Sequence, residues 1–408
     1  MIAPHIQDLI TSKGASVIRK MFEEGVALKK QHGEANVFDF SLGNPDLDPP
    51  VEVVRAVREV AVDTSHGAHG YMPNAGYDST REAMADKTAV EQEIPRDTIS
   101  GSNVVMTVGA ASALNCVFKA ILSPADEVIV PAPFFAEYRH YVGNYGGKLI
   151  EVSTKADFSL DTAALQAALS SRTAAVLINS PNNPTGKVYT EEDIVRLTDA
   201  LKVHATTTGR TPYLICDEPY RAITYDGVRV PPVFPHYDDS VIVTSFAKNL
   251  SLPGERIGYI AVNPASMGCS EFIAACTFAL RVTGCVNAPA FFQKVVARSW
   301  DAPCDYSRYD ARRRLLMAIL DRTGIQYAQP EGAFYLFCKV PPQWKNGDDM
   351  TFCDYLKKFL ILSAPGSGFG GRGWFRLAYC VSEATIIGSE AAFAAAMRGL
   401  ETNSVTVE

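Results

Sequence analysis

The feature that most constrains the fold is a series of short apolar runs, each ending in polar or turn-forming residues, between about residues 105 and 260. Runs in which successive residues are all apolar are typical of strands buried on both faces of a sheet. The segments between them carry apolar residues at helical spacing, so strands and helices alternate along the chain. This alternation predicts βαβ units and an α/β fold with a mostly parallel sheet. The predicted strands are 104–106, 128–130, 175–178, 213–216 and 241–243.

A different order of elements follows residue 290. The pattern there predicts three helices separated by two strands, which indicates a smaller α+β domain. We expect residues 1–45 to form an N-terminal arm and part of this small domain, 46–289 the large domain and 290–408 the small C-terminal domain. The elements predicted outside the large domain are a helix at 15–30, a strand at 38–42, a helix at 309–320, a strand at 334–337, a helix at 352–359, a strand at 374–379 and a final alanine-rich helix.

Length, charge and cysteine content limit the classes of function. The 408 residues suffice for two or three domains of about 150 residues each. With 38 basic and 45 acidic residues the net charge is −7, so we expect no nucleic-acid partner. The 9 cysteines are scattered without a C-x-x-C pair, which is typical of buried thiols in a reducing compartment. Neither a signal-peptide pattern nor a membrane-spanning apolar run is present, so we expect a cytoplasmic protein without a membrane partner.

Three motif-like segments carry weaker predictions. Residues 366–371 match G-x-G-x-x-G by letters, but a strand-like pattern follows them, so a loop is favoured over a dinucleotide site. His66 and His69 have no third ligand nearby, and no metal site is expected. The run of three arginines at 312–314, inside an amphipathic helix, is predicted to face solvent.

The informative residues stand at the carboxyl ends of the predicted strands, where open α/β sheets bind ligands. Small residues at 108–112 open a helix after the first strand, which lets backbone N–H groups approach an anion. Asp217 follows the fourth strand and Lys248 the fifth, so a carboxylate and an amine are expected in one crevice. The Asp217 carboxylate needs a cation to offset its burial. The apolar residues within 246–250 would desolvate Lys248 and favour the neutral amine that forms a Schiff base.

Eight motifs, in their order and spacing, resemble the class I/II family of fold-type I pyridoxal-phosphate-dependent aminotransferases. The resemblance extends over nearly the whole chain, and the lysine motif with its downstream arginine is its most specific part. It implies a large domain on a mostly parallel seven-stranded sheet, a smaller α+β domain, pyridoxal 5′-phosphate as cofactor and a homodimer with composite sites. The motifs are SLGNPD (41–46), YMPNAG (71–76), VGAAS (108–112), PAPFFAEY (131–138), NSPNNPTG (179–186), DEPY (217–220), SFAKNLSLPGERIGY (245–259) and GWFRLAY (373–379).

The resemblance implies a role for each residue that would meet the reacting part of the cofactor. Lys248 would form the Schiff base and move the proton between the substrate Cα and the cofactor. Asp217 would keep the pyridine nitrogen protonated, so that the ring can act as an electron sink. Tyr220 and Asn183 would hydrogen-bond the phenolic oxygen, and Phe135 would stack on the ring.

The remaining matched residues would hold the phosphate and the substrate. Tyr71 would reach the phosphate bound by the neighbouring subunit. Arg376 would grip the substrate α-carboxylate through two parallel hydrogen bonds, with Gly43 and Asn183 beside it. A charge among the apolar residues of that strand calls for an anionic partner in any case. The phosphate contacts within one subunit would be Ser245, Arg256, Gly109, Ala110 and Ala111.

Two other functions share part of this pattern. A β-lyase that cleaves cysteine conjugates would carry every one of these motifs. A regulator with an aminotransferase-like sensor domain would need a DNA-binding domain, for which the roughly 40 residues before SLGNPD are too few. For an aminotransferase, the resemblance leaves aspartate, alanine and aromatic amino acids as candidate donors, with 2-oxoglutarate as the expected acceptor. An acidic donor needs a second cation, for which Arg281 and Arg19 are candidates.

Overall fold

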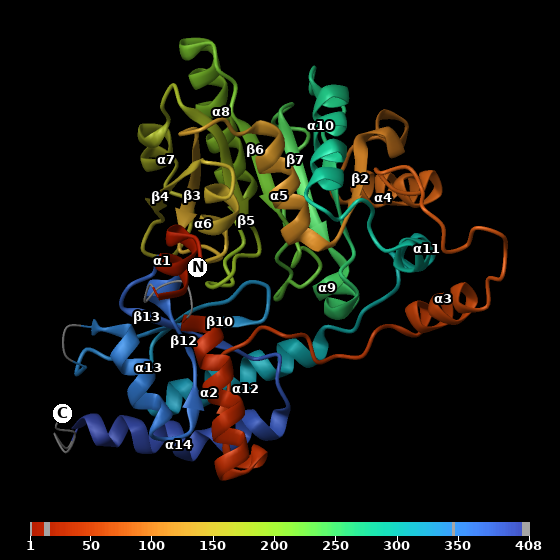
Figure 1. The fold of residues 1–408 in the computed structure, drawn as a ribbon. Helices are drawn as coiled ribbons and strands as arrows, with labels where there is room; N and C mark the ends of the chain where they lie inside the picture. The colour runs from red at the N-terminus through yellow and green to blue at the C-terminus, as the bar shows by residue number, and fades with distance from the viewer. Residues whose placement is uncertain (1, 12–16, 345–346, 402–408) are drawn as a thin grey trace.

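The structure is a computed structural model that describes residues 2–11, 17–344 and 347–401. Figure 1 shows a large sheet with helices on both faces and, below it, a smaller group of strands and helices formed mainly by the C-terminal third of the chain. No helix in the described ranges is both long enough and apolar enough to cross a membrane.

The large sheet has seven strands, and five neighbouring strands in it are parallel, which confirms the predicted α/β class. In spatial order the strands are β2 (Val104–Thr107), β8 (Gly258–Val262), β7 (Ser240–Ser245), β6 (Tyr213–Asp217), β5 (Thr173–Asn179), β3 (Glu127–Ala132) and β4 (Lys148–Ser153). β8 is antiparallel to both of its neighbours. Two strands go beyond the five predicted. β4 is a partly exposed edge strand with polar residues, and β8 begins within the lysine motif.

Helices cover both faces of the large sheet, and the strand side chains alternate between two hydrophobic cores. One core is closed by α3 (Val51–Ala61), α4 (Asp78–Glu91), α7 (Thr162–Ala168), α8 (Glu191–Thr208) and α11 (Ala290–Ser299). The other is closed by α5 (Gly109–Ile121), α6 (Tyr138–Gly143) and α10 (Cys269–Val282). Ile129 points into the first core, and Val128 and Val130 point into the second. Burial on both faces explains why these strands are continuous apolar runs.

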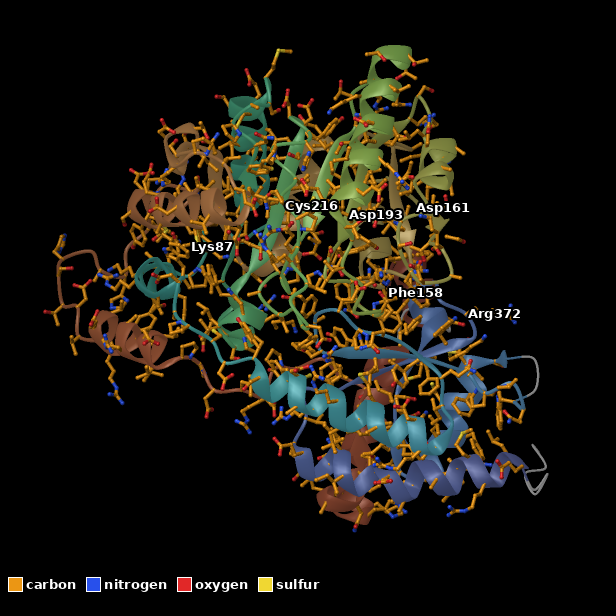
Figure 2. All side chains as sticks on the ribbon, turned by 180° about the vertical axis from the view of Figure 1, so that it is seen from behind. Lys87, Phe158, Asp161, Asp193, Cys216 and Arg372 are labelled. Carbon is orange, nitrogen blue, oxygen red and sulfur yellow. The ribbon has the colours of Figure 1, made fainter. Side chains whose placement is uncertain are left out.

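Side-chain caps set the starts of two of these helices. At α8, the Thr190 hydroxyl accepts from the Asp193 backbone N–H and the Asp193 carboxylate accepts from the Thr190 backbone N–H, both at 3.1 Å. At α7, the Asp161 carboxylate accepts from the Ala164 backbone N–H at 3.0 Å. Figure 2 labels Asp161 and Asp193 in the helical layer and Cys216 in the sheet beside it. These caps stabilise the layer that covers one face of the sheet.

The cysteines behave as the scattered pattern predicts. All 9 are free thiols, and most of them lie in the cores. The buried ones are Cys116, Cys216, Cys276, Cys338, Cys353 and Cys380.

The smaller group of elements is built on a four-stranded antiparallel sheet, in the order β12-β13-β10-β9, with a hydrophobic core between this sheet and its helices. A parallel pair, β1 with β11, attaches the N-terminal segment to this group. The predicted elements after residue 290 are all present, with bounds shifted by a few residues. The strands are β1 (Phe38–Asp39), β9 (Tyr327–Ala328), β10 (Tyr335–Lys339), β11 (Ile361–Leu362), β12 (Ala364–Pro365) and β13 (Trp374–Ala378). The helices of this group are α2 (Val17–His32), α12 (Ser307–Thr323), α13 (Asp349–Lys357) and α14 (Glu383–Glu401), and the short helix α1 (Pro4–Thr11) precedes α2 in the chain.

The glycine-rich segment 366–371 is not a dinucleotide-binding turn. It begins as the 3₁₀-helix η6 (Gly366–Phe369), and after the turn at Gly370 the chain enters β13 instead of an α-helix. The other 3₁₀-helices that the structure describes are η1 (Glu34–Asn36), η2 (Arg96–Thr98), η3 (Gly101–Asn103) and η4 (Pro253–Glu255).

The prediction that the three-arginine run faces solvent is wrong for two of its members. Arg312 and Arg313 are 2% and 1% exposed, whereas the Arg314 side chain is 61% exposed. Carboxylates from distant segments reach the buried pair: Arg312 contacts Asp46 at 2.7 Å and Arg313 contacts Asp226 at 2.7 Å. The local sequence does not show these partners, which lie far away along the chain.

Arg313→Ala is expected to destabilise the protein by roughly 2–4 kcal/mol, because it leaves partner groups unpaired around a buried site. The lost contacts include the Pro330 carbonyl, which accepts from Arg313 at 3.0 Å. Arg314→Ala is the matched control: its exposed ion pair with the same Asp226 is worth less than about 1 kcal/mol. Urea unfolding midpoints of the two variants test this, and equal midpoints would contradict the structural role of Arg313.

Candidate functional site

The predicted site residues come from adjacent strand ends of the large sheet and from the small sheet facing them. β5 and β6 are paired in register, with Asn179 opposite Asp217 at their carboxyl ends. Lys248 lies in the short helix α9 (Phe246–Asn249), directly after β7. Arg376 approaches from β13 of the small sheet. Figure 1 shows α9 at the junction between the two groups of elements.

The Lys248 amine is held near two aromatic rings at this junction. Its Nζ donates to the Gly43 carbonyl at 2.8 Å and lies 5.8 Å from the Tyr220 ring centroid and 5.4 Å from that of Phe334. Burial, assisted by the positive charge of Arg376, lowers the pKa of Lys248 from 10.5 to about 8. A larger fraction of this amine is therefore neutral and nucleophilic near neutral pH.

The groups that desolvate Lys248 differ from those predicted. Phe246 and Leu250 point away, into the core of the large sheet. The rings of Tyr220 and Phe334 take that role, and Phe334 reaches the site from the small domain. Desolvation of the amine therefore depends on a tertiary contact that the local sequence does not reveal.

Asp217 is 5% exposed at the end of β6 and keeps one carboxylate oxygen free. Its Oδ2 accepts from the Tyr138 hydroxyl at 2.5 Å, whereas Oδ1 has no hydrogen-bond partner in the described ranges. Burial raises the pKa of Asp217 to about 7, although the hydrogen bond from Tyr138 works in the opposite direction. The predicted cation is not found among the described side chains. A buried, unpaired carboxylate oxygen is costly, and it fits a protonated ring nitrogen.

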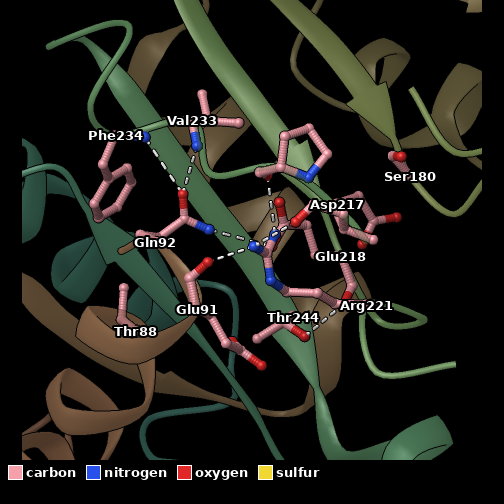
Figure 3. A network of polar contacts seen from close by, with 12 residues as sticks. Thr88, Glu91, Gln92, Ser180, Asp217, Glu218, Arg221, Val233, Phe234 and Thr244 are labelled. Atoms are coloured by element: carbon pink, nitrogen blue, oxygen red, sulfur yellow. Dashed lines mark hydrogen bonds and ion pairs between the residues drawn. The ribbon is translucent and has the colours of Figure 1, made fainter. Parts of the chain in front are cut away.

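A buried polar network holds the turn that follows Asp217 (Figure 3). Arg221 donates to the Glu218 carboxylate at 3.0 Å, and Gln92 approaches the same carboxylate at 3.5 Å. The Thr244 hydroxyl donates to the Glu218 backbone carbonyl at 3.1 Å. Because these partners come from the end of α4 and from β7, the turn is anchored on two sides. Asp217 is thereby held in one place.

Asn183 links the loop after β5 to both halves of the site. Its side-chain oxygen accepts from Arg376 Nη1 at 2.9 Å, and its backbone N–H donates to Asn179 Oδ1 at 2.7 Å. The Asn179 side-chain amide donates to the Asp217 carbonyl at 2.8 Å. The side-chain amide N–H groups of Asn183 have no partner among the described residues and stay available to an acceptor in the site.

The Arg376 guanidinium is buried and only partly satisfied by protein groups. Nη1 bonds Asn183, Nη2 donates to the Ser41 carbonyl at 2.6 Å, and Nε has no partner in the described part of the chain. The planar group lies 4.5 Å from the Tyr335 ring and 4.8 Å from the Phe369 ring. Since arginine carries five N–H donors, Nε and two others are free to bind an anion.

The predicted phosphate contacts cluster at the start of α5. Gly109 has a φ of +76°, and a Cβ there would lie 2.9 Å from Arg256 Nη2, so glycine allows the guanidinium to approach. The first-turn N–H groups of Gly109, Ala110 and Ala111 have no intrahelical partners and lie at the positive end of the helix. Ser245 is buried at the end of β7. This combination suits a phosphate.

Two predicted residues lie differently from the rest. Phe135 is half-buried and meets Tyr138 edge-on, with ring centroids 5.6 Å apart. Tyr71 is 92% exposed, and no contact joins it to the other predicted site residues in the described ranges. Its loop is held by Asn74, which donates to the Val286 carbonyl at 3.0 Å. The structure therefore does not bring Tyr71 into the site of its own chain.

Four site residues were not predicted from the sequence: Tyr138, Phe334, Tyr335 and Phe369. Tyr138 stands in the quoted PAPFFAEY motif, and a tyrosine after a predicted strand end could have been recognised as a partner for Asp217. Tyr335 lies within the predicted strand 334–337, and nothing local separates it from a core residue. Phe369 lies in the glycine-rich segment.

Comparisons with known proteins agree with this geometry. A model of the family "Aminotransferase class I and II" matches residues 35–387. The chain is 31% identical over 374 residues to a probable aspartate/prephenate aminotransferase of Aquifex aeolicus, covering 86% of this chain and 89% of that protein. An amino transferase structure from Eubacterium rectale matches with a TM-score of 0.91 at 37% identity, over 98% of each chain. Aspartate aminotransferase of Thermus thermophilus with maleate matches with a TM-score of 0.83 at 28% identity, over 97% of this chain and 99% of that one.

The chain belongs to the class I and II aminotransferase family. It is a pyridoxal-phosphate-dependent aminotransferase whose substrates are amino acids and 2-oxo acids. The predictions of the enzyme class, the cofactor and the mostly parallel seven-stranded sheet are confirmed.

Capture of pyridoxal phosphate by the cofactor-free protein is expected to follow the titration of Lys248. With a pKa of about 8, about one-tenth of the amine is neutral at pH 7, and the capture rate should rise with pH and level off above about 8. Stopped-flow absorbance at a series of pH values measures this rate. Borohydride reduction followed by peptide mapping should then find the pyridoxyl group on Lys248, and labelling of another lysine would contradict the assignment.

Proposed function

We propose that Lys248, Asp217 and Arg376 form the reacting centre of this aminotransferase. The observation that carries the proposal is that three groups where the two sheets meet, the partly buried Lys248 and the buried Asp217 and Arg376, each have a property that a ligand would match. The Lys248 amine has a lowered pKa, Asp217 has an unpaired oxygen, and Arg376 has free N–H donors. The cofactor ring nitrogen would pair with the free oxygen of Asp217, and the substrate carboxylate would accept from the free N–H groups of Arg376.

Each side chain of the site then has a defined task. Pyridoxal phosphate, when bound, supplies the electron sink that stabilises negative charge at the substrate Cα. Lys248 would hold the cofactor and would move the proton of the substrate Cα. Asp217 keeps a proton on the pyridine nitrogen, and Tyr138 holds Asp217 in place. Tyr220 and Asn183 donate to the phenolic oxygen. The remaining cofactor contacts are Phe135 against the ring and Ser245, Arg256, Gly109, Ala110 and Ala111 around the phosphate.

We propose L-aspartate as the preferred amino donor and 2-oxoglutarate as the acceptor. Arg376 would bind the α-carboxylate of either substrate, with the backbone of Gly43 beside it. The names of the relatives in Aquifex and Thermus, both of which include aspartate, support this choice. Alanine and aromatic amino acids are the alternatives to be compared.

The second cation that an acidic side chain requires is proposed to come from a partner subunit of a homodimer. Arg281 is exposed in the last turn of α10. The segment that follows α10 contacts the loop of Tyr71, because Asn74 donates to Val286 and Asn287 donates to the Pro73 carbonyl at 3.0 Å. A dimer that brings Tyr71 to a neighbouring site would carry Arg281 with it. Arg19 lies in α2, and its side chain is outside the described residues.

We propose a cytoplasmic location for the enzyme. The 9 free thiols, most of them buried, suit a reducing compartment and would be at risk of oxidation outside it.

A panel of L-amino acids with 2-oxoglutarate tests the donor assignment, and L-aspartate is expected to have the highest kcat/KM.

Arg376→Lys should lower kcat/KM for all donors alike, by on the order of ten- to a hundredfold, because it keeps the charge but loses the paired hydrogen bonds. A variant that discriminates between acidic and neutral donors would show that Arg376 reads the side chain. Release of ammonia and pyruvate without an acceptor would identify a β-lyase.

Subunit exchange tests the composite site. If Tyr71 and Lys248 of one site come from different chains, a hybrid of Tyr71→Phe and Lys248→Ala subunits has one intact site and one site with both lesions. Half of the dimers are hybrids after equal mixing, so activity should return to about one quarter of wild type. Each variant incubated alone is the control. No recovery after proven exchange, or an active monomer in sedimentation, would contradict the proposal.

A further inference from the structure

Tyr335 lies where the two halves of the site meet. It is the first residue of β10, which pairs antiparallel with β13, with Phe337 opposite Arg376 and Tyr335 opposite Ala378. Directly opposed residues share a face of the sheet, and so do residues two apart along a strand. Tyr335 and Arg376 are therefore diagonal neighbours on one face.

The Tyr335 hydroxyl is paired with a residue that faces the cofactor site. It lies 2.8 Å from the Tyr220 hydroxyl, and both side chains are almost fully buried. Two buried hydroxyls in contact use one donor between them, so one proton of the pair is free for another acceptor. When Tyr335 donates to Tyr220, the Tyr220 proton is directed away from Tyr335 and toward the site.

The Tyr335 ring supports the guanidinium that binds the substrate carboxylate. Arg376 Cζ lies 4.5 Å from the Tyr335 ring centroid and 4.8 Å from the Phe369 centroid. An aromatic face within this distance attracts the cation and restricts its position. The cation in turn lowers the pKa of Tyr335, which burial raises to about 12, so the hydroxyl stays protonated at neutral pH.

Tyr335 also sets the path of the loop that contacts Lys248. A Cβ at Gly43 would overlap the Tyr335 hydroxyl, so the backbone passes directly against it. The Gly43 carbonyl is the acceptor for Lys248 Nζ at 2.8 Å. The Tyr335 side chain thus contacts Tyr220, Arg376 and the backbone of Gly43.

A second tyrosine pair in the same core shows what a purely structural arrangement looks like. The Tyr379 hydroxyl lies 3.3 Å from the Tyr225 hydroxyl and donates to the Ala333 carbonyl at 3.2 Å. Neither tyrosine of that pair contacts a predicted site residue. Tyr335 differs because the proposed function gives a ligand contact to each of its partners, Tyr220 and Arg376.

We propose that Tyr335 is a positioning residue for transamination: its hydroxyl aims the Tyr220 proton at the phenolic oxygen of the cofactor, and its ring holds Arg376 for the substrate carboxylate. The inference rests on the proposed roles of Tyr220 and Arg376. The two functions are separable, because Tyr335→Phe removes the hydroxyl alone, whereas Tyr335→Met removes both the hydroxyl and the ring, so that comparing the two variants isolates the ring.

The hydroxyl is tested by a pH titration of the absorbance of the cofactor-bound protein without substrate. Loss of the hydrogen bond from Tyr335 weakens the donation by Tyr220 to the phenolic oxygen of the cofactor. In Tyr335→Phe the midpoint pH of the absorbance change should therefore rise by roughly 0.4–1 pH unit. In a Tyr220→Phe background, Tyr335→Phe should cause no further shift, because its route of action is already removed. Tyr379→Phe is the matched control and should titrate like wild type.

The ring is tested by binding of maleate, a dicarboxylate that does not react, followed by the same absorbance. Loss of the ring from one face of Arg376 should weaken maleate binding about threefold to tenfold in Tyr335→Met, whereas Tyr335→Phe should change it less than twofold. Tyr335→Leu replaces the methionine variant if that variant does not fold.

The outcomes separate this inference from the function on which it rests. A wild-type protein that binds neither the cofactor through Lys248 nor maleate would overturn the proposed function. A wild-type protein that binds both, with a Tyr335→Phe titration equal to wild type or an additive shift in the double variant, would overturn the role of the Tyr335 hydroxyl. Unchanged maleate binding without the ring would overturn its role in holding Arg376.

Discussion

The parallel pairing of β5, β6 and β7 is the constraint on which the site depends. It brings Asn179 and Asp217 level at one edge of the sheet and starts the helix of Lys248 beside them. Hydrogen bonds within this edge, such as that from Asn179 to the Asp217 carbonyl, then hold the loops that carry the other polar groups. Since both faces of these strands are buried, a slip in register would place charged groups inside a hydrophobic core. The positions of Asn179, Asp217 and Lys248 therefore follow from the packing of the sheet.

Within that frame, burial shifts two pKa values in opposite directions. It lowers that of Lys248 to about 8 and raises that of Asp217 to about 7, because in each case the charged form loses its hydration. Shifts of this kind are characteristic of functional sites. A bound cofactor with a positive ring nitrogen would relieve the cost for Asp217. The free protein thus carries a local electrostatic cost that ligand binding can offset.

The sequence predicted the α/β class, the elements after residue 290 and the set of polar residues at the strand ends, because each leaves a local pattern. It could not predict contacts between distant segments. Tertiary packing supplies the rings that desolvate Lys248. It also supplies the carboxylates that pair with the buried Arg312 and Arg313, and the Tyr138 hydroxyl that donates to Asp217. β8 was missed for a different reason: it begins within the last residues of the lysine motif. The sequence patterns therefore predicted which polar side chains stand at the strand ends, and tertiary packing determines their burial and their partners.

The segment around β1 has a consequence for how the molecule is made. Arg376 donates to the Ser41 carbonyl across 335 residues of sequence, and the Ala378 backbone N–H donates to the Phe40 carbonyl at 2.9 Å. Contacts of such long range form late, because the loop they close must first be restricted. During synthesis, the large sheet and Lys248 are complete before the strand that carries Arg376 leaves the ribosome. The contacts of Arg376 and Ala378 with the N-terminal segment thus form last, when the two ends of the polypeptide meet.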